Sequence, residues 1–244
     1  MNESSRRDWI GLCAAAGAFG IFGSPLRAAE ASTPAVSAVD HLLLGVSDLD
    51  RGMAWVEEKS GVRAVVGGSH PGVGTRNALL SLGGRRYLEI IAPDPAQNAL
   101  TLRIDLRTLS EPRLITWAAA TRDIDVLAKK AREAGLRTDG PEPGSRRRPD
   151  GTILRWRTLG LKVDLAADGV DPIPFFIEWA SDSRHPSTDS PEGCELESLE
   201  IEHPRPSEVN AILGKVGIEA GVKSGRSALL RATVRTPKGT AKLF

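Results

Sequence analysis

The stretch "VDHLLLGVSDLDRGMAWVEEKSG", residues 39–61, contains a short apolar run followed by a helical repeat. Residues 39–46 have the length and composition of a buried strand. Ser47 or Asp48 can cap the helix that follows, because its apolar residues recur at helical spacing from this point. Gly61 is placed to end that helix. The stretch therefore predicts one strand, one helix and a glycine stop.

The same order of elements recurs further along the chain. The first copy continues with strand-like runs near 62–66, 77–82 and 86–92, the last two separated by a Gly83-Gly84 hairpin signal. The second copy consists of a strand at 113–121, a helix at 122–135, a hairpin at 145–159 and a closing strand at 173–180. The two helices align without a gap, with Asp48, Leu49 and Asp50 opposite Asp123, Ile124 and Asp125. Such a repeat predicts duplicated βαβββ modules that pack on each other in an α+β fold.

A weaker third copy follows at residues 195–244. It has one strand-like run, a helix whose cap would be Ser207, and several short strands. The predicted domains are a signal peptide (1–31), a linker (32–38), a two-module domain (39–180, with modules 39–95 and 113–180), a linker (181–194) and this third module (195–244). An odd number of modules cannot all pair within one chain, so a homodimer is a possible arrangement.

The N-terminal residues have the three parts of an export signal. Ser5, Arg6, Arg7, Asp8, Trp9 and Ile10 resemble the twin-arginine motif, an apolar run follows, and Ala29, Glu30 and Ala31 form a cleavage signal. This pattern predicts a periplasmic or secreted protein with no membrane attachment after cleavage. An uncleaved anchor is the alternative, although the run is short for a spanning helix.

The charge balance gives no reason to expect a nucleic-acid partner. The formal net charge is +1, and the basic cluster at 146–148 is typical of a solvated surface. The partner expected is a small-molecule substrate or ligand. Cys194 is the only cysteine that remains after cleavage, so the fold does not depend on an internal disulfide.

Two carboxylates stand in the middle of apolar strands. Glu89 lies in "YLEII" (87–91) and Glu178 lies in "FFIEW" (175–179), each in the closing strand of its module. Removing an unpaired carboxylate from water costs roughly several kcal/mol. We therefore expect a partner for each acid, and His41, near the start of the first strand, could join both of them around a divalent metal with open positions.

The duplicated modules, His41 and the two acids resemble the vicinal oxygen chelate superfamily, which includes glyoxalase I, extradiol dioxygenases, epimerases and drug-binding resistance proteins. The segments "HPGVGTRNALLSLGGRRYLEIIAPDP" and "PFFIEWASDSRHPS" resemble more narrowly its glyoxalase-like domain group. The resemblance implies that paired modules form a cupped, incompletely closed mixed β-sheet barrel with the site inside. It covers about residues 39–190 and, more loosely, the remainder.

The resemblance also implies a set of metal ligands from the first and last strand of each module. Carried onto this chain, they are His41, Glu89 and Glu178, while Thr116, with Trp117 beside it, stands where the remaining ligand is expected. His70 or His185 could complete the set. The ion would be zinc, nickel, manganese or iron. The residues expected to bind substrate are Trp117, Trp156, Arg148 and His185.

Three functions are compatible with this reading. The first is a metal-dependent lyase or isomerase in which Glu178 serves as ligand or catalytic base for a small carbonyl- or hydroxyl-bearing substrate. A dioxygenase would be a variant of it that needs His70 or His185 on iron. The second is a metal-free binding protein of the drug-sequestration type, with Trp117 and Trp156 as pocket walls. The third is a scaffold in which the acids pair with arginines such as Arg86 or Arg155.

Overall fold

The computed structural model describes residues 32–98, 100–102, 104–148 and 150–244. The described residues form one compact unit. The expected signal peptide, residues 1–31, lies outside the described residues. In the part of the chain that is described, no helix combines the length and the apolar character that crossing a membrane requires.

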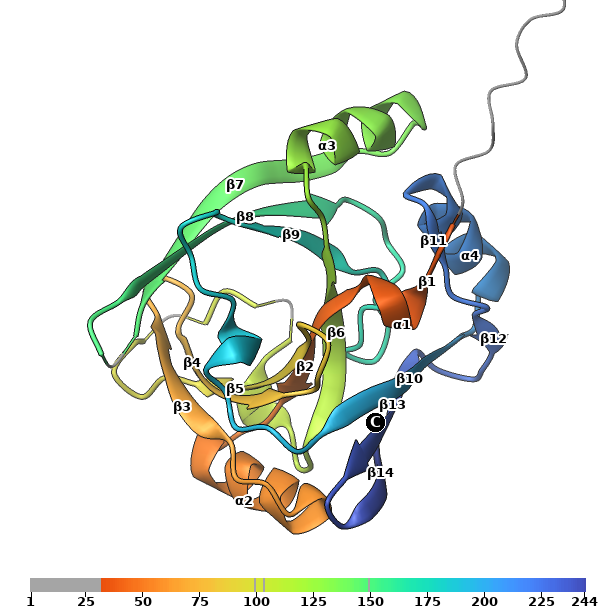
Figure 1. Cartoon of the computed structure of the whole chain (residues 1–244). Helices are drawn as coiled ribbons and strands as arrows, with labels where there is room; N and C mark the ends of the chain where they lie inside the picture. The colour runs from red at the N-terminus through yellow and green to blue at the C-terminus, as the bar shows by residue number, and fades with distance from the viewer. Residues whose placement is uncertain (1–31, 99, 103, 149) are drawn as a thin grey trace, which may run out of the picture. The chain divides into compact units, whose positions relative to one another are not determined.

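Eight strands form one curled sheet that is not closed (Figure 1), in the order β3-β4-β5-β2-β6-β9-β8-β7. Their bounds are β2 (Val39–Gly45), β3 (Val65–His70), β4 (Thr75–Ser81), β5 (Tyr87–Pro93), β6 (Arg113–Ala120), β7 (Thr138–Arg147), β8 (Ile153–Leu161) and β9 (Phe175–Trp179). The opening strands β2 and β6 pair antiparallel at the centre, and the closing strands β5 and β9 lie parallel beside them. The two halves repeat one topology, which confirms the predicted α+β fold of duplicated modules.

One helix in each module covers the outer face of the sheet. These helices are α2 (Leu49–Ser60) and α3 (Ile124–Glu133), and they begin at the two residues that the repeat aligns. Asp48 accepts a hydrogen bond from the Arg51 backbone N–H at 2.9 Å. Asp123 does the same for Val126, also at 2.9 Å. Asp48, rather than Ser47, is therefore the N-cap of α2.

The alternation of side chains along the strands separates the core from the site. Leu42 and Leu44 of β2 and Leu88 of β5 point outward into the main hydrophobic cluster, against the helices. His41 of β2 and Glu89 of β5 therefore point to the concave inner face. Both modules direct their inner strands toward this one space.

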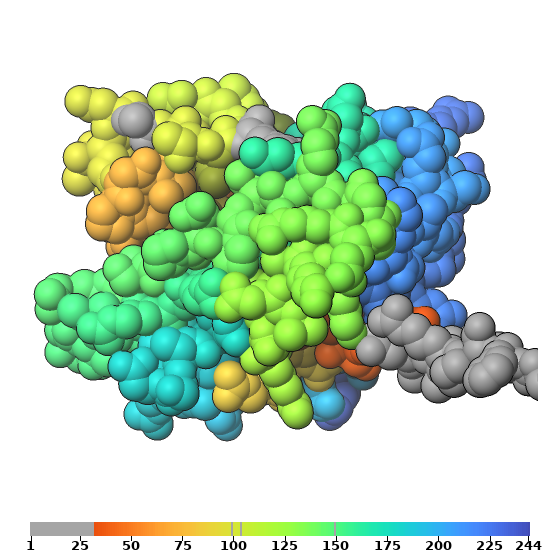
Figure 2. Space-filling view, turned by 90° about the horizontal axis from the view of Figure 1, so that it is seen from above, coloured from red at the N-terminus to blue at the C-terminus, as the bar shows by residue number. Residues whose placement is uncertain are grey.

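The C-terminal region forms a second sheet of its own, in the order β12-β10-β13-β14. Its elements are β10 (Glu195–His203), α4 (Pro206–Lys215), β11 (Ile218–Glu219), β12 (Lys223–Ser224), β13 (Leu229–Thr236) and β14 (Gly239–Leu243). The remaining short elements are β1 (Thr33–Pro34), which pairs with β11, α1 (Ala35–Ala38) and the 3₁₀ turns η1 (Leu106–Thr108) and η2 (Pro186–Thr188). In Figure 2 this blue region lies beside the green surface of the second module.

The helix of this region starts differently from the prediction. Helix α4 begins at Pro206, its N-cap is Arg205, and no side chain caps it. The prediction that Ser207 caps this helix is therefore wrong. Proline suits the first helical position because its missing N–H would have no partner there.

Candidate active site

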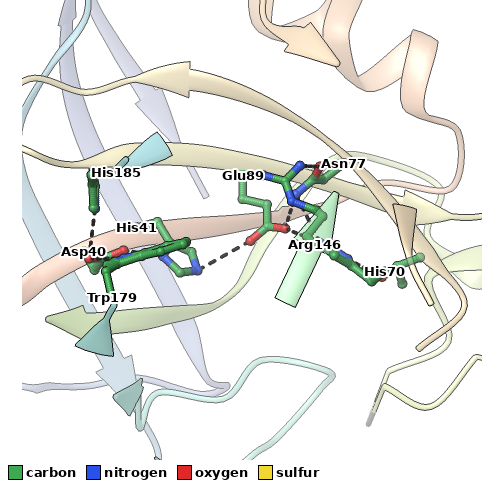
Figure 3. A network of polar contacts seen from close by, with 9 residues as sticks. Asp40, His41, His70, Asn77, Glu89, Arg146, Trp179 and His185 are labelled. Atoms are coloured by element: carbon green, nitrogen blue, oxygen red, sulfur yellow. Dashed lines mark hydrogen bonds and ion pairs between the residues drawn. The ribbon is translucent and has the colours of Figure 1, made fainter. Parts of the chain in front are cut away.

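The concave face of the sheet surrounds a cavity of about 470 Å³. Its size lies within the range of small-molecule sites. Most of its wall is apolar, but polar side chains enter it from five strands: His41 (β2), His70 (β3), Asn77 (β4), Glu89 (β5) and Arg146 (β7). Figure 3 shows how these side chains meet.

Asp40 and His41 are neighbours in the chain, yet their side chains meet. Successive residues of a regular strand point to opposite faces. Along β2, however, the step from Val39 to His41 spans two residues, whereas the facing step on β6 spans one. Asp40 is the extra residue of a β-bulge, which redirects its side chain. His41 Nδ1 donates to Asp40 Oδ1 at 2.8 Å, and each residue is 3% exposed.

Three donors hold the Asp40 carboxylate. Besides His41, the Trp179 indole N–H and His185 Nε2 both donate to Oδ2 at 3.1 Å. The Ser187 backbone N–H donates to His185 Nδ1, so the His185 proton is on Nε2. Burial raises the pKa of Asp40, but the hydrogen bonds from His185 and His41 outweigh burial and lower this pKa from 3.8 to about 2. Ionised Asp40 keeps the His41 proton on Nδ1 and leaves the Nε2 lone pair directed into the cavity.

Arg146 fixes the orientation of the Asn77 amide. Arg146 Nη1 donates to Asn77 Oδ1 at 3.0 Å, so the amide nitrogen faces the other way. There it donates to Glu89 Oε1 at 2.6 Å and lies 3.3 Å from His70 Nε2. His70 Nε2 is consequently an acceptor, and Nδ1–H donates to the Thr75 hydroxyl at 2.8 Å. Burial also lowers the pKa of His70, which favours the neutral ring.

Glu89 faces His41 across a short gap. The distance between Glu89 Oε2 and His41 Nε2 is 3.4 Å. Burial raises the pKa of Glu89, but the imidazoles of His70 and His41, the Asn77 hydrogen bond and the Arg146 charge lower it further than burial raises it. Both facing atoms carry lone pairs, and at this distance a single proton can lie between them and be shared. The pair can therefore exchange one proton with a group in the cavity.

The Arg146 guanidinium reaches this cluster because β3 has a glycine beside it. A Cβ atom on Gly67 would lie 2.4 Å from both Arg146 Nη1 and Asn77 Oδ1. Arg146 is 4% exposed. Burial lowers its pKa and the charge of Glu89 opposes that change, but a guanidinium stays protonated in proteins. The cavity thus contains a fixed positive charge next to the proton-exchanging pair.

Glu178 does not join the other predicted residues. On β9, Phe175, Ile177 and Trp179 face the cavity, so Glu178 points to the outer face. Its carboxylate lies 3.8 Å from Arg157 Nη1. It therefore pairs with an arginine, as the scaffold reading expected for both acids, although the partner is neither of the two arginines suggested.

The other predicted residues are divided between the cavity and its surroundings. His70 and Trp156 line the cavity. Trp117 does not, because it is fully buried in the main core and donates to the Pro172 carbonyl at 3.0 Å. Arg148 pairs with Asp189 away from the cavity, and His185 lies behind Asp40. The sequence analysis missed the roles of Asp40 and Asn77, and it selected Arg148 instead of Arg146. An acid directly beside the histidine in "VDHLLL" was the available signal for Asp40.

The donors around the cavity do not fit a bound metal as they are arranged. Glu89 lies 3.4 Å from His41 Nε2 and 3.6 Å from His70 Nε2. However, the Asn77 amide already donates to Glu89 Oε1 and faces the single ring lone pair of His70 Nε2. Across residues 32–98, 100–102, 104–148 and 150–244, no three His, Cys, Asp or Glu side chains form a group that could hold a metal ion. The metal implied by the resemblance therefore has no preformed ligand set here.

Several solved structures are similar to this chain, and one of them shares its fold. A hypothetical protein from Staphylococcus aureus has a TM-score of 0.62 at 15% identity, and the match covers 84% of this chain and 98% of that one. Methylmalonyl-CoA epimerase from Mycobacterium tuberculosis has a TM-score of 0.42 at 23% identity, covering 62% of this chain and 93% of that one. The epimerase from Streptomyces coelicolor, in complex with 2-nitronate-propionyl-CoA, has a TM-score of 0.42 at 23% identity, covering 60% and 97%.

No curated protein matches the chain. The model of one protein family does match it, described as a glyoxalase-like domain and covering residues 39–217. This match spans both βαβββ modules and continues through α4, so it includes the strands that carry His41 and Glu89. The resemblance found in the sequence is confirmed, and the chain belongs to the glyoxalase-like domain family.

Proposed function

We propose that this protein is an acid–base enzyme of the isomerase or lyase type, which moves a proton on a small carbonyl-bearing substrate. The observation that carries the proposal is the buried hydrogen bond between Asp40 and His41, which directs His41 Nε2 toward Glu89 at 3.4 Å inside a ligand-sized cavity. A histidine oriented by a carboxylate is the arrangement that general-base catalysis requires.

Each polar residue of the cavity has a role in this proposal. His41 Nε2 removes a proton from the carbon next to the substrate carbonyl, and Asp40 stabilises the resulting imidazolium. Glu89 exchanges the proton with His41 and returns it to the product. The negative charge that develops on the carbonyl oxygen is stabilised by the buried guanidinium of Arg146, since an electrostatic interaction is stronger away from water. No step depends on a metal.

The test is hydrogen exchange at the reacting carbon. The full chain is incubated in D₂O with ketones, thioesters and 2-oxo acids that have a hydrogen next to the carbonyl, and deuterium incorporation is followed by NMR. We expect His41→Gln to slow exchange by about 100-fold or more, the usual contribution of a general base. Asp40→Asn should slow it by at least about tenfold, because His41 loses its orientation.

Glu178→Gln is the matched control, because Glu178 is an acid in an equivalent strand that faces away from the cavity. This variant should catalyse deuterium exchange into the substrate at the same rate as the parent. Equal rates in the parent and His41→Gln would overturn the proposal. Stoichiometric metal in the purified protein, lost in both His41→Ala and Glu89→Ala, would instead support the metal-dependent reaction that the resemblance implies.

A second candidate is a metal-free binding protein. Its support is the apolar wall of the cavity, together with the Trp156 and Trp179 rings, whose centroids lie 5.4 Å apart. The same experiment separates the two functions. A binding protein would retain its ligand, as measured by calorimetry, and incorporate no deuterium.

A further inference from the structure

We propose that the substrate has a neutral aliphatic chain, which extends from the reacting carbonyl into a second cavity behind the first. This inference rests on the proposed function, because it takes the His41 and Glu89 end of the cavity as the place of reaction. It adds the chemical class of the rest of the substrate.

The second cavity borders the first. Its volume is about 500 Å³, and Leu43, Leu102, Asp139, Gly160 and Phe175 line both this cavity and the one that contains His41. Beyond the shared wall it is lined mainly by aliphatic side chains, among them Ile104, Ile115 and Ile173. A substrate with its carbonyl at His41 can therefore continue past Leu43 without leaving the concave face of the sheet.

Part of the apolar wall is separate from the main core of the protein, whereas Ile173 belongs to the main cluster. Leu43, Ile91, Leu106 and Ile115 form a second hydrophobic cluster on the concave side, with Phe175 packed against it. The outer-facing residues of the same strands already supply the core beneath the helices. The inner apolar surface is thus available to a ligand, and each methylene buried on it would add to affinity.

The charged side chains of the two cavities determine in which direction the substrate lies. The described lining of the second cavity includes Asp139, Asp168 and Asp171 and no Lys, Arg or His. The first cavity contains Arg146. The first cavity also contains the carboxylates of Glu89, Glu142 and Asp139, the last of which lines both cavities. Arg146 is nevertheless the only Lys or Arg in either described lining, so an anionic head of the substrate lies at Arg146 and the far end of the aliphatic chain is uncharged.

Gly160 lines both cavities. It lies on β8 on the same face as Trp156 and Thr158, which line the first cavity. A Cβ atom on Gly160 would meet only Asp139, at 3.5 Å, an ordinary contact. A larger side chain here would enter the passage without disturbing the sheet, and a β-branched residue suits a strand. Gly160→Val is therefore a variant that narrows the passage toward the second cavity.

The experiment measures binding of straight-chain 2-oxo acids of four to twelve carbons to the full chain by calorimetry. We expect Kd to fall about fourfold for each added methylene until the second cavity is filled, the factor that corresponds to about 0.8 kcal/mol per methylene. In Gly160→Val the short acids should bind as in the parent, whereas the dependence on length should disappear. Val126→Ala is the control, because Val126 is 47% exposed on α3.

The outcomes separate this inference from the proposed function. A Kd that does not depend on chain length overturns the aliphatic chain, even if His41→Gln still abolishes deuterium exchange. An equal dependence on length in the parent and in Gly160→Val overturns the assignment to the second cavity. A dependence that Gly160→Val removes, in a protein that exchanges no deuterium, supports the chain and contradicts the enzyme.

Discussion

Asp40 is almost completely buried and accepts hydrogen bonds from three donors. It is therefore the residue whose charge the fold stabilises most clearly. Its carboxylate accepts from His41, His185 and Trp179, which come from three different segments of the chain. Removing its charge would leave three buried N–H groups with a weaker acceptor. A single side chain therefore links the orientation of the proposed base to the stability of the fold.

This arrangement predicts a specific loss of stability in acid. The ionised form of Asp40 is favoured in the fold, where its pKa is about 2 instead of 3.8. Its contribution is therefore complete above pH 4 and is lost as the pH falls toward 2, by about 2 kcal/mol in total. We expect the difference in unfolding free energy between the parent and Asp40→Asn to shrink by about this amount between pH 5 and pH 2.5, measured by urea denaturation. A difference that stays constant would contradict the assignment.

The site could be predicted only in part from the sequence. Residue patterns indicate which side chains of a strand share a face of the sheet, but not which face becomes the concave one. Glu89 and Glu178 occupy similar closing strands, and alternation correctly places each on the same side as the residues two positions away. Which side is concave depends on how the sheet curls, and only Glu89 lies there. The role of Asp40 could not be predicted without the bulge between β2 and β6. The role of Asn77 depends on its contact with Arg146, which is 69 residues away in sequence.

At the scale of elements, the repeat was the most reliable guide, because capping chemistry is local. Asp48 and Asp123 lie three residues before the backbone N–H groups that they accept from, and both helices begin where the alignment places them. The third copy follows the same order but starts its helix with Pro206. A local signal alone, such as Ser207, could not distinguish a cap from an ordinary first-turn residue.

The helix caps predict how much stability is lost when each proposed cap residue is replaced by alanine. Asp48→Ala and Asp123→Ala should each lower the unfolding free energy by about 1 kcal/mol, since each removes the acceptor of a helix N-terminus. Ser207→Ala should change it by no more than about 0.5 kcal/mol, because the Ser207 side chain caps nothing. Urea denaturation of the three variants measures this. Equal losses in all three would mean that the helix ends differ from those described.

At the scale of the whole described chain, the third region packs into the same hydrophobic cluster as the two modules. Leu199 and Leu230 belong to that cluster together with Leu42 of β2. In addition, Lys238 Nζ, from the turn between β13 and β14, donates to the Glu58 carbonyl near the end of α2 at 2.9 Å. The odd number of modules is therefore accommodated within one chain and gives no reason for a homodimer, which stays a prediction to be tested by gel filtration.

This shared core predicts that residues 32–244 unfold in one transition. The four tryptophans of residues 32–244 all lie in the two modules, so their fluorescence reports on the modules and not on the C-terminal region; they are Trp55, Trp117, Trp156 and Trp179. Leu230 lies in that region and is 0% exposed. Leu230→Ala should nevertheless lower the midpoint of the fluorescence transition, because a buried Leu→Ala change lowers the free energy of unfolding by about 2–5 kcal/mol. Phe244→Ala, at a residue that is 56% exposed, should leave the midpoint nearly unchanged. A fluorescence midpoint unaffected by Leu230→Ala, with a separate transition in circular dichroism, would show that the C-terminal region folds independently.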